Sequence, residues 1–188
     1  MSEQDPNRLA IDYLLATRSG GDGADALAAR LATLSEGALR RGLGDDRSRK
    51  AFWLDLYNAE VIRAGTVDLT DRITRWRHFR RGTVTVAGKR LSLDAIENGL
   101  LRRSSWKLGL GYVPNPVPGR FERAHRVDRV DPRIHFALNC GATSCPPIAA
   151  YDPARLDEQL ELATRSYLST EVQVDGGVLR VPAVLLWY

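Results

Sequence analysis

The sequence contains little cysteine and little histidine, and these two shortages exclude several classes of protein. Only 2 of its 188 residues are cysteines and only 3 are histidines. Two cysteines cannot build the disulfide framework that stabilises small secreted domains. So few donors also disfavour a structural zinc site with four converging ligands, and we expect no metal. Cys140 and Cys145 are five residues apart, which is not the Cys-x-x-Cys spacing of thiol redox motifs.

Long apolar runs are absent as well. No stretch approaches the ~18 consecutive apolar residues of a membrane-spanning helix, and the N-terminal MSEQDPNRLA lacks the pattern of a secretory signal. We therefore expect a cytoplasmic protein with no membrane partner. Hydrophobic residues make up 44% of the chain and charged residues 27%, and its length suffices for one compact domain with its own core.

The sequence also lacks a glycine-rich phosphate loop, a dinucleotide fingerprint and paired metal carboxylates, so no cofactor is expected. The formal net charge is +4 and the isoelectric point is about 9.3. A modest basic excess is usually a solvated surface, so nucleic acid is a partner that the sequence allows but does not favour. The pattern leaves the partner open, whether protein or small molecule, and also the oligomeric state.

Hydrophobic spacing and turn residues predict an α+β fold, with several helices packed on a small, mainly antiparallel sheet. Glycine and proline are frequent between residues 104 and 127, which we expect to form a long loop. The C-terminal VPAVLLWY is apolar throughout, and we expect it to be packed against the rest of the chain. Helices are expected at residues 7–16, 25–41, 48–65, 93–104 and 154–170, and hairpins at 83–93 and 171–181.

The stretch VDPRIHFALNCGATSCPP, residues 130–147, holds both cysteines and is the strongest candidate for chemistry. Alternation of apolar and polar residues predicts a central strand over residues 133–140, with its apolar side chains toward the core and His135 on the opposite face. Gly141 then permits a sharp turn into a helix. Cys145 would lie near the N-terminus of that helix, where the backbone dipole stabilises a thiolate.

Polar residues within two otherwise apolar helices complete the set of candidate site residues. Asp55 and Asn58 are three positions apart, and so they lie on one face of the aromatic-rich helix at residues 48–65. Glu97 lies among apolar neighbours on the helix at residues 93–104. A buried amide or carboxylate without a partner costs about 1–3 kcal/mol or more, so each of these groups needs one. They either brace a neighbouring loop or belong to a polar site.

Three separated segments of the chain resemble a known family. They are KAFWLDLYNA at residues 50–59, LDAIENGLLR at residues 93–102 and DPRIHFALNCGATSCPP at residues 131–147. With these motifs, residues 45–188 resemble the family called domain of unknown function 547, and residues 1–44 form a helical extension outside the resemblance. The resemblance implies an uncharacterised domain, with a papain-like or transglutaminase-like cysteine hydrolase as one interpretation. The chain departs from the family pattern at Asp55, where members carry asparagine, and at Asn98, where they carry histidine.

Three functions remain open from the sequence. The favoured one is a non-catalytic interaction or structural module of unknown partner, in which the cysteines are packing groups. The alternative is a cysteine-dependent acyl-transfer enzyme or amide hydrolase with Cys145 as nucleophile and His135 as base. The carboxylate or amide that orients the imidazole in that enzyme would be one of Glu97, Asn58 and Asp55. The third function is thiol redox chemistry or metal binding by the two cysteines and His135.

Overall fold

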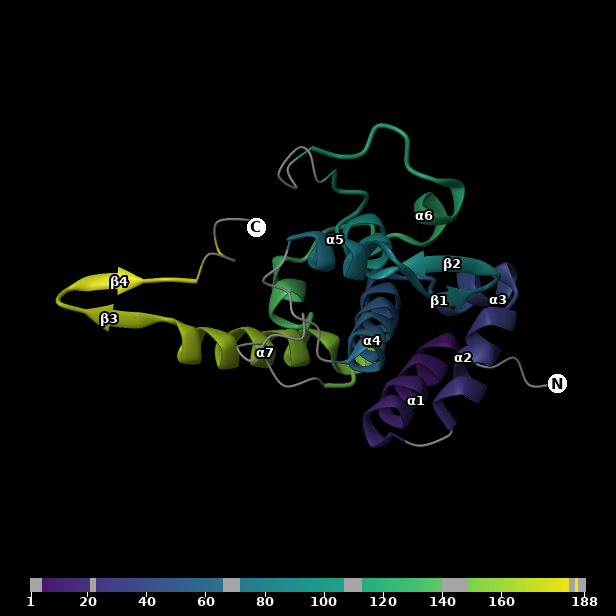
Figure 1. Cartoon of the computed structure of the whole chain (residues 1–188), viewed down its shortest axis with the longest axis horizontal. Helices are drawn as coiled ribbons and strands as arrows, with labels where there is room; N and C mark the ends of the chain where they lie inside the picture. The colour runs from purple at the N-terminus through teal and green to yellow at the C-terminus, as the bar shows by residue number, and fades with distance from the viewer. Residues whose placement is uncertain are drawn as a thin grey trace.

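The computed structural model describes residues 5–20, 23–65, 72–106, 113–139, 149–182 and 185. Helices dominate these residues, and the strands within them form two separate two-stranded antiparallel sheets (Figure 1). The chain is therefore α+β, as the sequence predicts. In chain order the elements are α1 (Pro6–Ser19), α2 (Gly23–Thr33), α3 (Glu36–Gly42), α4 (Asp46–Ala64), α5 (Arg72–Arg80), β1 (Gly82–Val86), β2 (Lys89–Ser92), the π-helix η1 (Ala95–Leu101), α6 (Arg120–His125), the 3-10 helices η3 (Pro132–Phe136) and η4 (Pro153–Arg155), α7 (Leu156–Glu171), β3 (Gln173–Asp175) and β4 (Val178–Arg180).

Helix α4 lies at the centre of the body, as its aromatic-rich sequence predicts (Figure 1). All residues from Ala51 to Val61 are buried, so the helix is covered on every side. The Asp45 carboxylate caps its N-terminus by accepting a hydrogen bond from Ser48 N at 2.9 Å. Gly65 ends the helix with φ 68°, a backbone conformation that favours glycine.

The N-terminal helices share the hydrophobic core of α4. Leu9, Tyr13 and Leu14 of α1 are buried in the same cluster as the α4 side chains. Inside this interface the Tyr13 hydroxyl donates a short hydrogen bond to the Glu60 carboxylate of α4. Residues before α4 are therefore packed into the body, and they stabilise it by removing the apolar surface of α4 from water.

The predicted helix over residues 25–41 is wrong, because the chain forms two helices there, α2 and α3. The Ser35 hydroxyl accepts a hydrogen bond from Ala38 N at 3.0 Å and so caps α3. Serine is a preferred N-cap residue, and Glu36 in the first turn adds a favourable charge at the helix N-terminus. At this position the capping signal outweighs the continuing helical spacing of the leucines.

The predicted hairpin at residues 83–93 is present as β1 and β2. Its turn at Ala87 and Gly88 has φ values of 48° and 73°, the left-handed values that a two-residue hairpin turn uses. The same turn binds the hairpin to α2, because Ala87 N and Gly88 N donate to the carbonyls of Leu31 and Ala32 at 3.0 Å and 2.9 Å. The hairpin is thereby fixed over the N-terminal helices.

The predicted central strand over residues 133–140 is wrong. The described part of that stretch contains the 3-10 helix η3, which Asp131 caps by accepting a hydrogen bond from Arg133 N at 3.1 Å. Aspartate followed by proline is a strong helix-start signal, and here it overrides the strand alternation. Of the apolar residues of the alternation, Ile134, Phe136 and Leu138 are buried as expected, and Cys140 lies outside the described residues. Ala137, which the alternation places on the opposite face, is buried too.

One further predicted helix is present, and the predicted long loop is helical in part. Helix α7 coincides with the predicted helix at residues 154–170, and Asp152 caps the preceding turn η4 by accepting from Ala154 N at 2.8 Å. Of the predicted long loop, the described residues contain the short helix α6 and a strand-like bridge between Ser105 and Pro114.

None of the described helices combines the length and the apolar character needed to cross a membrane.

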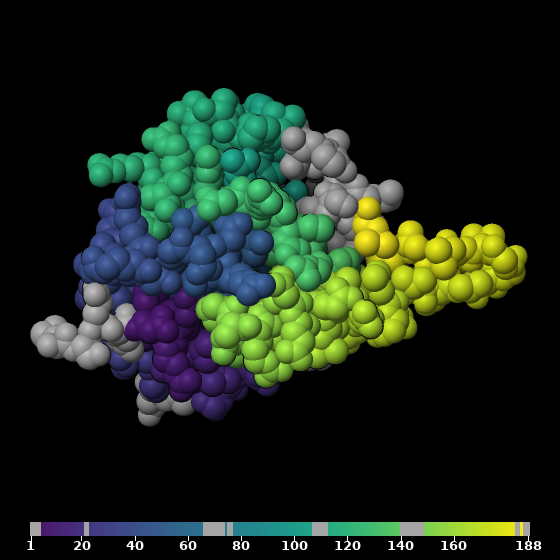
Figure 2. Space-filling model, turned by 180° about the vertical axis from the view of Figure 1, so that it is seen from behind, coloured from purple at the N-terminus to yellow at the C-terminus, as the bar shows by residue number. Residues whose placement is uncertain are grey.

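We call residues 156–182, which contain α7 and the β3–β4 hairpin, the arm. The arm extends away from the body and ends in the projecting hairpin (Figures 1 and 2). The first half of α7 is docked by the buried side chains of Leu156 and Leu160. Val181 and Leu185 are exposed, so the expectation that the apolar C-terminal run is packed is wrong for these two residues.

Candidate functional site

The Asn58 side chain, on the buried polar face of α4, binds the chain that leads toward the cysteines. Its Nδ2 donates to the Ala137 carbonyl at 3.1 Å, and its Oδ1 accepts from Asn139 N at 3.0 Å. One side-chain amide thus satisfies a backbone acceptor and a backbone donor two residues apart, as a neighbouring strand would. Because Asn58 is fully buried, both bonds are shielded from water and fix this segment to α4.

Asp55, one helical turn before Asn58, binds the chain on the far side of the cysteines. Its Oδ1 accepts from Tyr151 N at 2.9 Å, and the residue is 1% exposed. Burial raises the pKa of this carboxyl well above its usual range; the Tyr151 hydrogen bond opposes the rise, and the nearby charge of Asp152 adds to it. The environment of Asp55 therefore favours the neutral acid.

Asp55 and Asn58 together bind the described chain on either side of residues 140–148, at Tyr151 and at residues 137–139, to one face of α4. Cys140 and Cys145, with the predicted helix start between them, lie outside the described residues, as do Gly141 and the prolines that follow Cys145. The sequence left open whether Asp55 and Asn58 brace a neighbouring loop or belong to a polar site. Their hydrogen bonds to backbone groups are those of residues that brace a loop. Their spacing in the sequence indicated a shared face, but not which backbone groups they hold.

His135 lies on η3 and is half-buried. Burial, with a smaller contribution from the positive charge of Arg102, lowers the pKa of its imidazole to about 3. At neutral pH the ring is therefore neutral. A neutral imidazole can accept a proton as a general base, but it cannot supply the positive charge that stabilises a neighbouring thiolate.

Glu97 lies on η1 close to Arg102, the cation that lowers the pKa of His135. Its Oε1 is 3.8 Å from the Arg102 Nη1, and the same Nη1 donates to the Asn98 Oδ1 at 3.0 Å. The Asn98 amide in turn donates to Asp94 Oδ1 at 3.0 Å. Asn98 thus positions Arg102. The recorded partner of Glu97 is this arginine.

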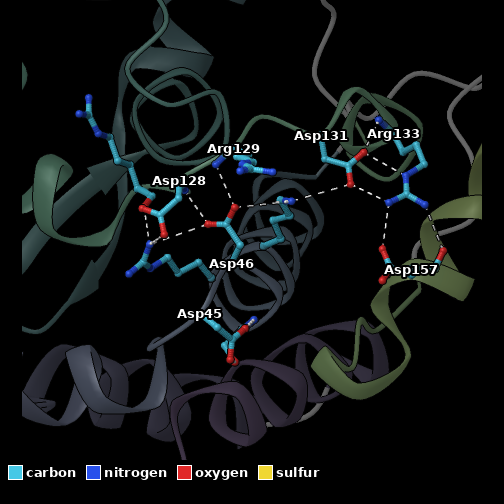
Figure 3. Close-up of polar contacts among 11 residues, drawn as sticks. Asp45, Asp46, Asp128, Arg129, Asp131, Arg133 and Asp157 are labelled. Atoms are coloured by element: carbon cyan, nitrogen blue, oxygen red, sulfur yellow. Dashed lines mark hydrogen bonds and ion pairs between the residues drawn. The ribbon is translucent and has the colours of Figure 1, made fainter.

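Figure 3 shows a network of charges that places η3 beside α4. At the start of α4, the Asp46 carboxylate accepts from the backbone nitrogens of Asp128 and Arg129 at 2.6 Å and 2.9 Å. Further along, Arg133 forms an ion pair with Asp131 at 2.8 Å and with Asp157 of α7 at 3.0 Å. The segment that carries His135 is thus tied both to α4 and to α7.

Sequence reasoning missed Arg102, Asp131 and Tyr151. The pair Asp131-Pro132 carries a readable helix-start signal, of the same kind as the Asp152-Pro153 pair before α7. Tyr151 carries no local signal, because its contact with Asp55 joins segments far apart in the chain. Arg102 is four positions after Asn98, and this helical spacing is a signal for their contact.

The histidines and acids of the described residues do not form a metal site. Among the described residues, no group of three or more His, Cys, Asp or Glu side chains is placed to hold a metal ion. His125 is buried beside the Phe121 ring at 4.5 Å, with Glu36 as its nearest carboxylate at 4.0 Å. His78 lies on α5 and packs on Phe79 at 5.1 Å. These two histidines therefore do not converge with His135.

Comparison with known proteins gives a family and no closer relative. No curated protein and no solved structure matches the chain. The model of one family, described as "Protein of unknown function, DUF547", matches residues 42–168, which is more than half of the chain. The matched region begins just before α4 and ends within α7, and it includes all the candidate site residues. The chain therefore belongs to the DUF547 family.

Proposed function

We propose that the chain is a non-catalytic interaction module that binds a protein partner through its arm. The proposal is carried by the pattern of residues on the β3–β4 hairpin. The antiparallel register places Val174 opposite Leu179. Because side chains alternate along a strand, Val172 and Val181 belong to the same face. One face of the hairpin is thus entirely aliphatic, whereas the opposite face is mostly polar.

The aliphatic face of the hairpin is open to solvent. Val174 is 75% exposed, Leu179 is 60% exposed and Val181 is 48% exposed, and the hairpin stands clear of the body (Figure 2). Burial of each of these side chains would contribute about 1–2 kcal/mol to the binding of a partner. Contiguous apolar side chains on a projecting element are typical of an interaction surface.

The backbone and the charges of the hairpin indicate what kind of partner fits. Among the described residues, β3 and β4 pair only with each other, so the outer edge of each strand can accept another strand. The hairpin has two charged side chains, Asp175 and Arg180. Arg180 Nη2 and Asp175 Oδ2 are 3.9 Å apart, and their opposite charges cancel. The proposed partner is therefore a protein that adds an extended, aliphatic and uncharged segment to the edge and apolar face of the hairpin.

The contacts of the candidate catalytic residues support the same proposal. The side chains of Asp55 and Asn58 form hydrogen bonds with backbone groups, and Glu97 forms an ion pair with Arg102. His135 is neutral at neutral pH because of its lowered pKa. Each of these features is expected of an internal brace, and none requires a substrate.

The experiment is a comparison of tagged chains expressed in the native host, with the bound proteins quantified by mass spectrometry. Val174→Thr with Leu179→Thr removes the apolar face while keeping residues that favour strands. Val117→Thr, at an exposed valine outside the arm, is the matched control. We expect a partner that the double variant loses at least tenfold, and that the control and Cys145→Ala retain. The purified partner should also slow amide exchange in residues 173–180.

Two results would overturn the proposal. One is that no bound protein depends on Val174 and Leu179. The other is that every bound protein is lost with Cys145→Ala, which would move the function to the cysteine.

A cysteine-dependent acyl transferase or hydrolase, of papain-like or transglutaminase-like kind, is the second candidate. The observation that favours it is that α4 binds the described chain on both sides of the cysteines, at Asn139 and at Tyr151, and that His135 lies a few residues before the first of these contacts. In this reaction the Cys145 sulfur attacks an acyl carbonyl, His135 accepts the thiol proton, and that proton leaves with the departing group. The product is a thioester on Cys145.

An activated ester tests this second candidate directly. The chain is mixed with p-nitrophenyl acetate, and the release of p-nitrophenol and the mass of the Cys145 peptide are followed together. An enzyme would form the acetyl thioester faster than the denatured chain does, and His135→Ala would abolish the difference. Equal rates for the folded and denatured chains would exclude the candidate for this class of substrate.

A further inference from the structure

A cleft outside the arm and the α4 site lies between β2, η1 and the start of α6, with a volume of about 210 Å³. We call it the basic cleft. We propose that the basic cleft binds a small organic anion: a carboxylate or phosphate group carried on an apolar body the size of one ring. The inference is independent of the arm and its protein partner.

The floor of the basic cleft is apolar and held in place. Leu91 and Leu100 are buried at its base. The Phe121 ring is fixed by a tilted contact with the His125 ring at 4.5 Å and an edge contact with the Trp53 ring at 6.4 Å. A floor that is already formed costs little conformational entropy when a ligand binds.

Three cations, Lys89, Arg90 and Arg120, line the basic cleft. The Arg90 guanidinium is oriented by the Gly82 carbonyl, to which its Nε and Nη2 donate at 3.1 Å and 2.9 Å. Among the described residues, Lys89 and Arg120 have no carboxylate partner, and so their charges are available to a ligand. Guanidinium and ammonium donors at one cleft are the groups that recognise carboxylate and phosphate oxygens.

Glu122 is the one acid in the lining, and its position narrows the ligand class. It lies against η1 at Gly99, where an added Cβ would come within 3.3 Å of the Glu122 carboxyl carbon. Close to this carboxylate a second negative group is repelled, whereas a hydroxyl or amide donor is accepted. The lining therefore favours one anionic head group over a polyanion.

The volume sets the size of the ligand. At about 210 Å³ it is below the ~300–1,000 Å³ of sites for drug-sized molecules. A benzoate-sized or phenyl phosphate-sized molecule fits, and a nucleotide does not. Its ring would lie on Leu91, Leu100 and Phe121, with its head group toward Lys89 and Arg120.

The test is a titration of the full chain by calorimetry and by amide chemical shifts. The probes are phenyl phosphate and benzoate, with inorganic phosphate as the anion without a ring and benzyl alcohol as the ring without an anion. We expect saturable binding of at least one probe, with shifts at Leu91 and Arg120, and binding of both control molecules at least tenfold weaker. The tighter probe identifies the head group. Failure of both probes to bind at millimolar concentration would overturn the proposal.

Matched variants separate a built site from general attraction to a basic surface. Arg120→Gln and Lys89→Gln should each weaken binding by about 5- to 30-fold, the loss expected for one charge-assisted hydrogen bond. Arg123→Gln, on the same short helix but outside the lining, should change it less than about twofold. Equal losses in all three variants would contradict the proposal. The Val174→Thr and Leu179→Thr double variant should bind the probe normally, so the two proposals can fail separately.

Discussion

At the scale of the residue, Asp55 is a buried acid in a position where its charge is unfavourable. Its folded pKa is raised, mainly by burial. A group of this kind stabilises the fold fully below its usual pKa, and the stability is lost as the pH rises through the raised value. The neutral acid offers Tyr151 N the same acceptor that an amide would. Asparagine can therefore replace it.

We predict that Asp55→Asn stabilises the chain at high pH. The gain in free energy of unfolding should be about 1–3 kcal/mol at pH 8, the cost of a buried group that is not fully paired, and should shrink toward zero at pH 4. Urea unfolding at both pH values measures it. Asp128→Asn, at an exposed aspartate, is the control and should change stability by less than about 1 kcal/mol. A gain that does not depend on pH would contradict the prediction.

His125 is the second residue whose burial predicts a pH effect, in the opposite direction. It is 0% exposed, and neither ring nitrogen has a hydrogen-bond partner among the described residues. Burial, followed by the charge of Arg40, lowers its pKa to about 4. Because the folded value is depressed, the stability from this group is complete above about pH 6.5 and is lost as the pH falls toward 4.

We predict that His125→Leu removes part of the acid sensitivity of the chain. Between pH 7 and pH 5 the wild type should lose about 2 kcal/mol through this residue, at 1.36 kcal/mol per unit of pKa difference. The leucine variant should lose about 2 kcal/mol less of its free energy of unfolding over this range. The pH dependence that remains in the variant includes the contribution of His135. Denaturant unfolding at the two pH values gives the comparison. Parallel losses in wild type and variant would show that His125 does not titrate in this range.

At the scale of the element, local signals predicted most of the helices and both hairpins. The Ala87-Gly88 and Gly176-Gly177 turns and the Asp152-Pro153 helix start lie within a few residues of what they specify. The errors arose where two local signals competed: Ser35 divided a predicted helix, and Asp131-Pro132 converted a predicted strand into η3. In both places a cap satisfied backbone donors that the hydrophobic pattern ignores.

The sequence predicted which residues belong to the candidate site, but not which groups they contact. The sequence indicated that Asp55 and Asn58 share a face of α4, and that buried polar groups there need partners. It could not indicate that those partners are Tyr151 and the backbone around Asn139, because roughly ninety residues separate the donors from the acceptors. Pairing over such a distance is decided by packing rather than by local pattern.

We predict that Asn58→Ala loosens the segment that α4 holds. Removal of the amide leaves the Ala137 carbonyl and Asn139 N without their bonds, which should cost about 2–4 kcal/mol of unfolding free energy. Amide exchange should accelerate most at residues 137–139. Asn115→Ala, at a side chain that accepts an exposed hydrogen bond from Val117 N, should cost less than about 1 kcal/mol. Uniform acceleration across the chain would instead indicate a general loss of stability.

At the scale of the whole molecule, the N-terminal helices belong to the same hydrophobic core as the family region. The family match begins at residue 42, yet α1 contributes Leu9, Tyr13 and Leu14 to the surroundings of α4. The division into an extension at residues 1–44 and a domain at residues 45–188 remains a prediction about sequence relationship. For folding, the packing of α1 against α4 is the deciding feature.

We predict that a chain of residues 45–188 does not fold cooperatively. Loss of α1 exposes the apolar face of α4 and leaves the buried Glu60 without the Tyr13 hydroxyl. The truncated chain should keep helical signal in the far ultraviolet, lose near-ultraviolet signal and bind hydrophobic dyes. A single sharp urea transition with native near-ultraviolet signal would show that the family region folds alone.

The proposed non-catalytic function requires that neither cysteine acts as a reactive nucleophile. The measurement that tests it most directly is the rate of alkylation of each cysteine against pH, followed by mass spectrometry on the folded chain. Because His135 is neutral well below pH 7, we predict slow alkylation of Cys145, with a midpoint at or above the usual thiol value of about 8.5. Fast alkylation of Cys145 with a midpoint well below 8.5, lost in His135→Ala, would contradict the account and favour the thiol enzyme.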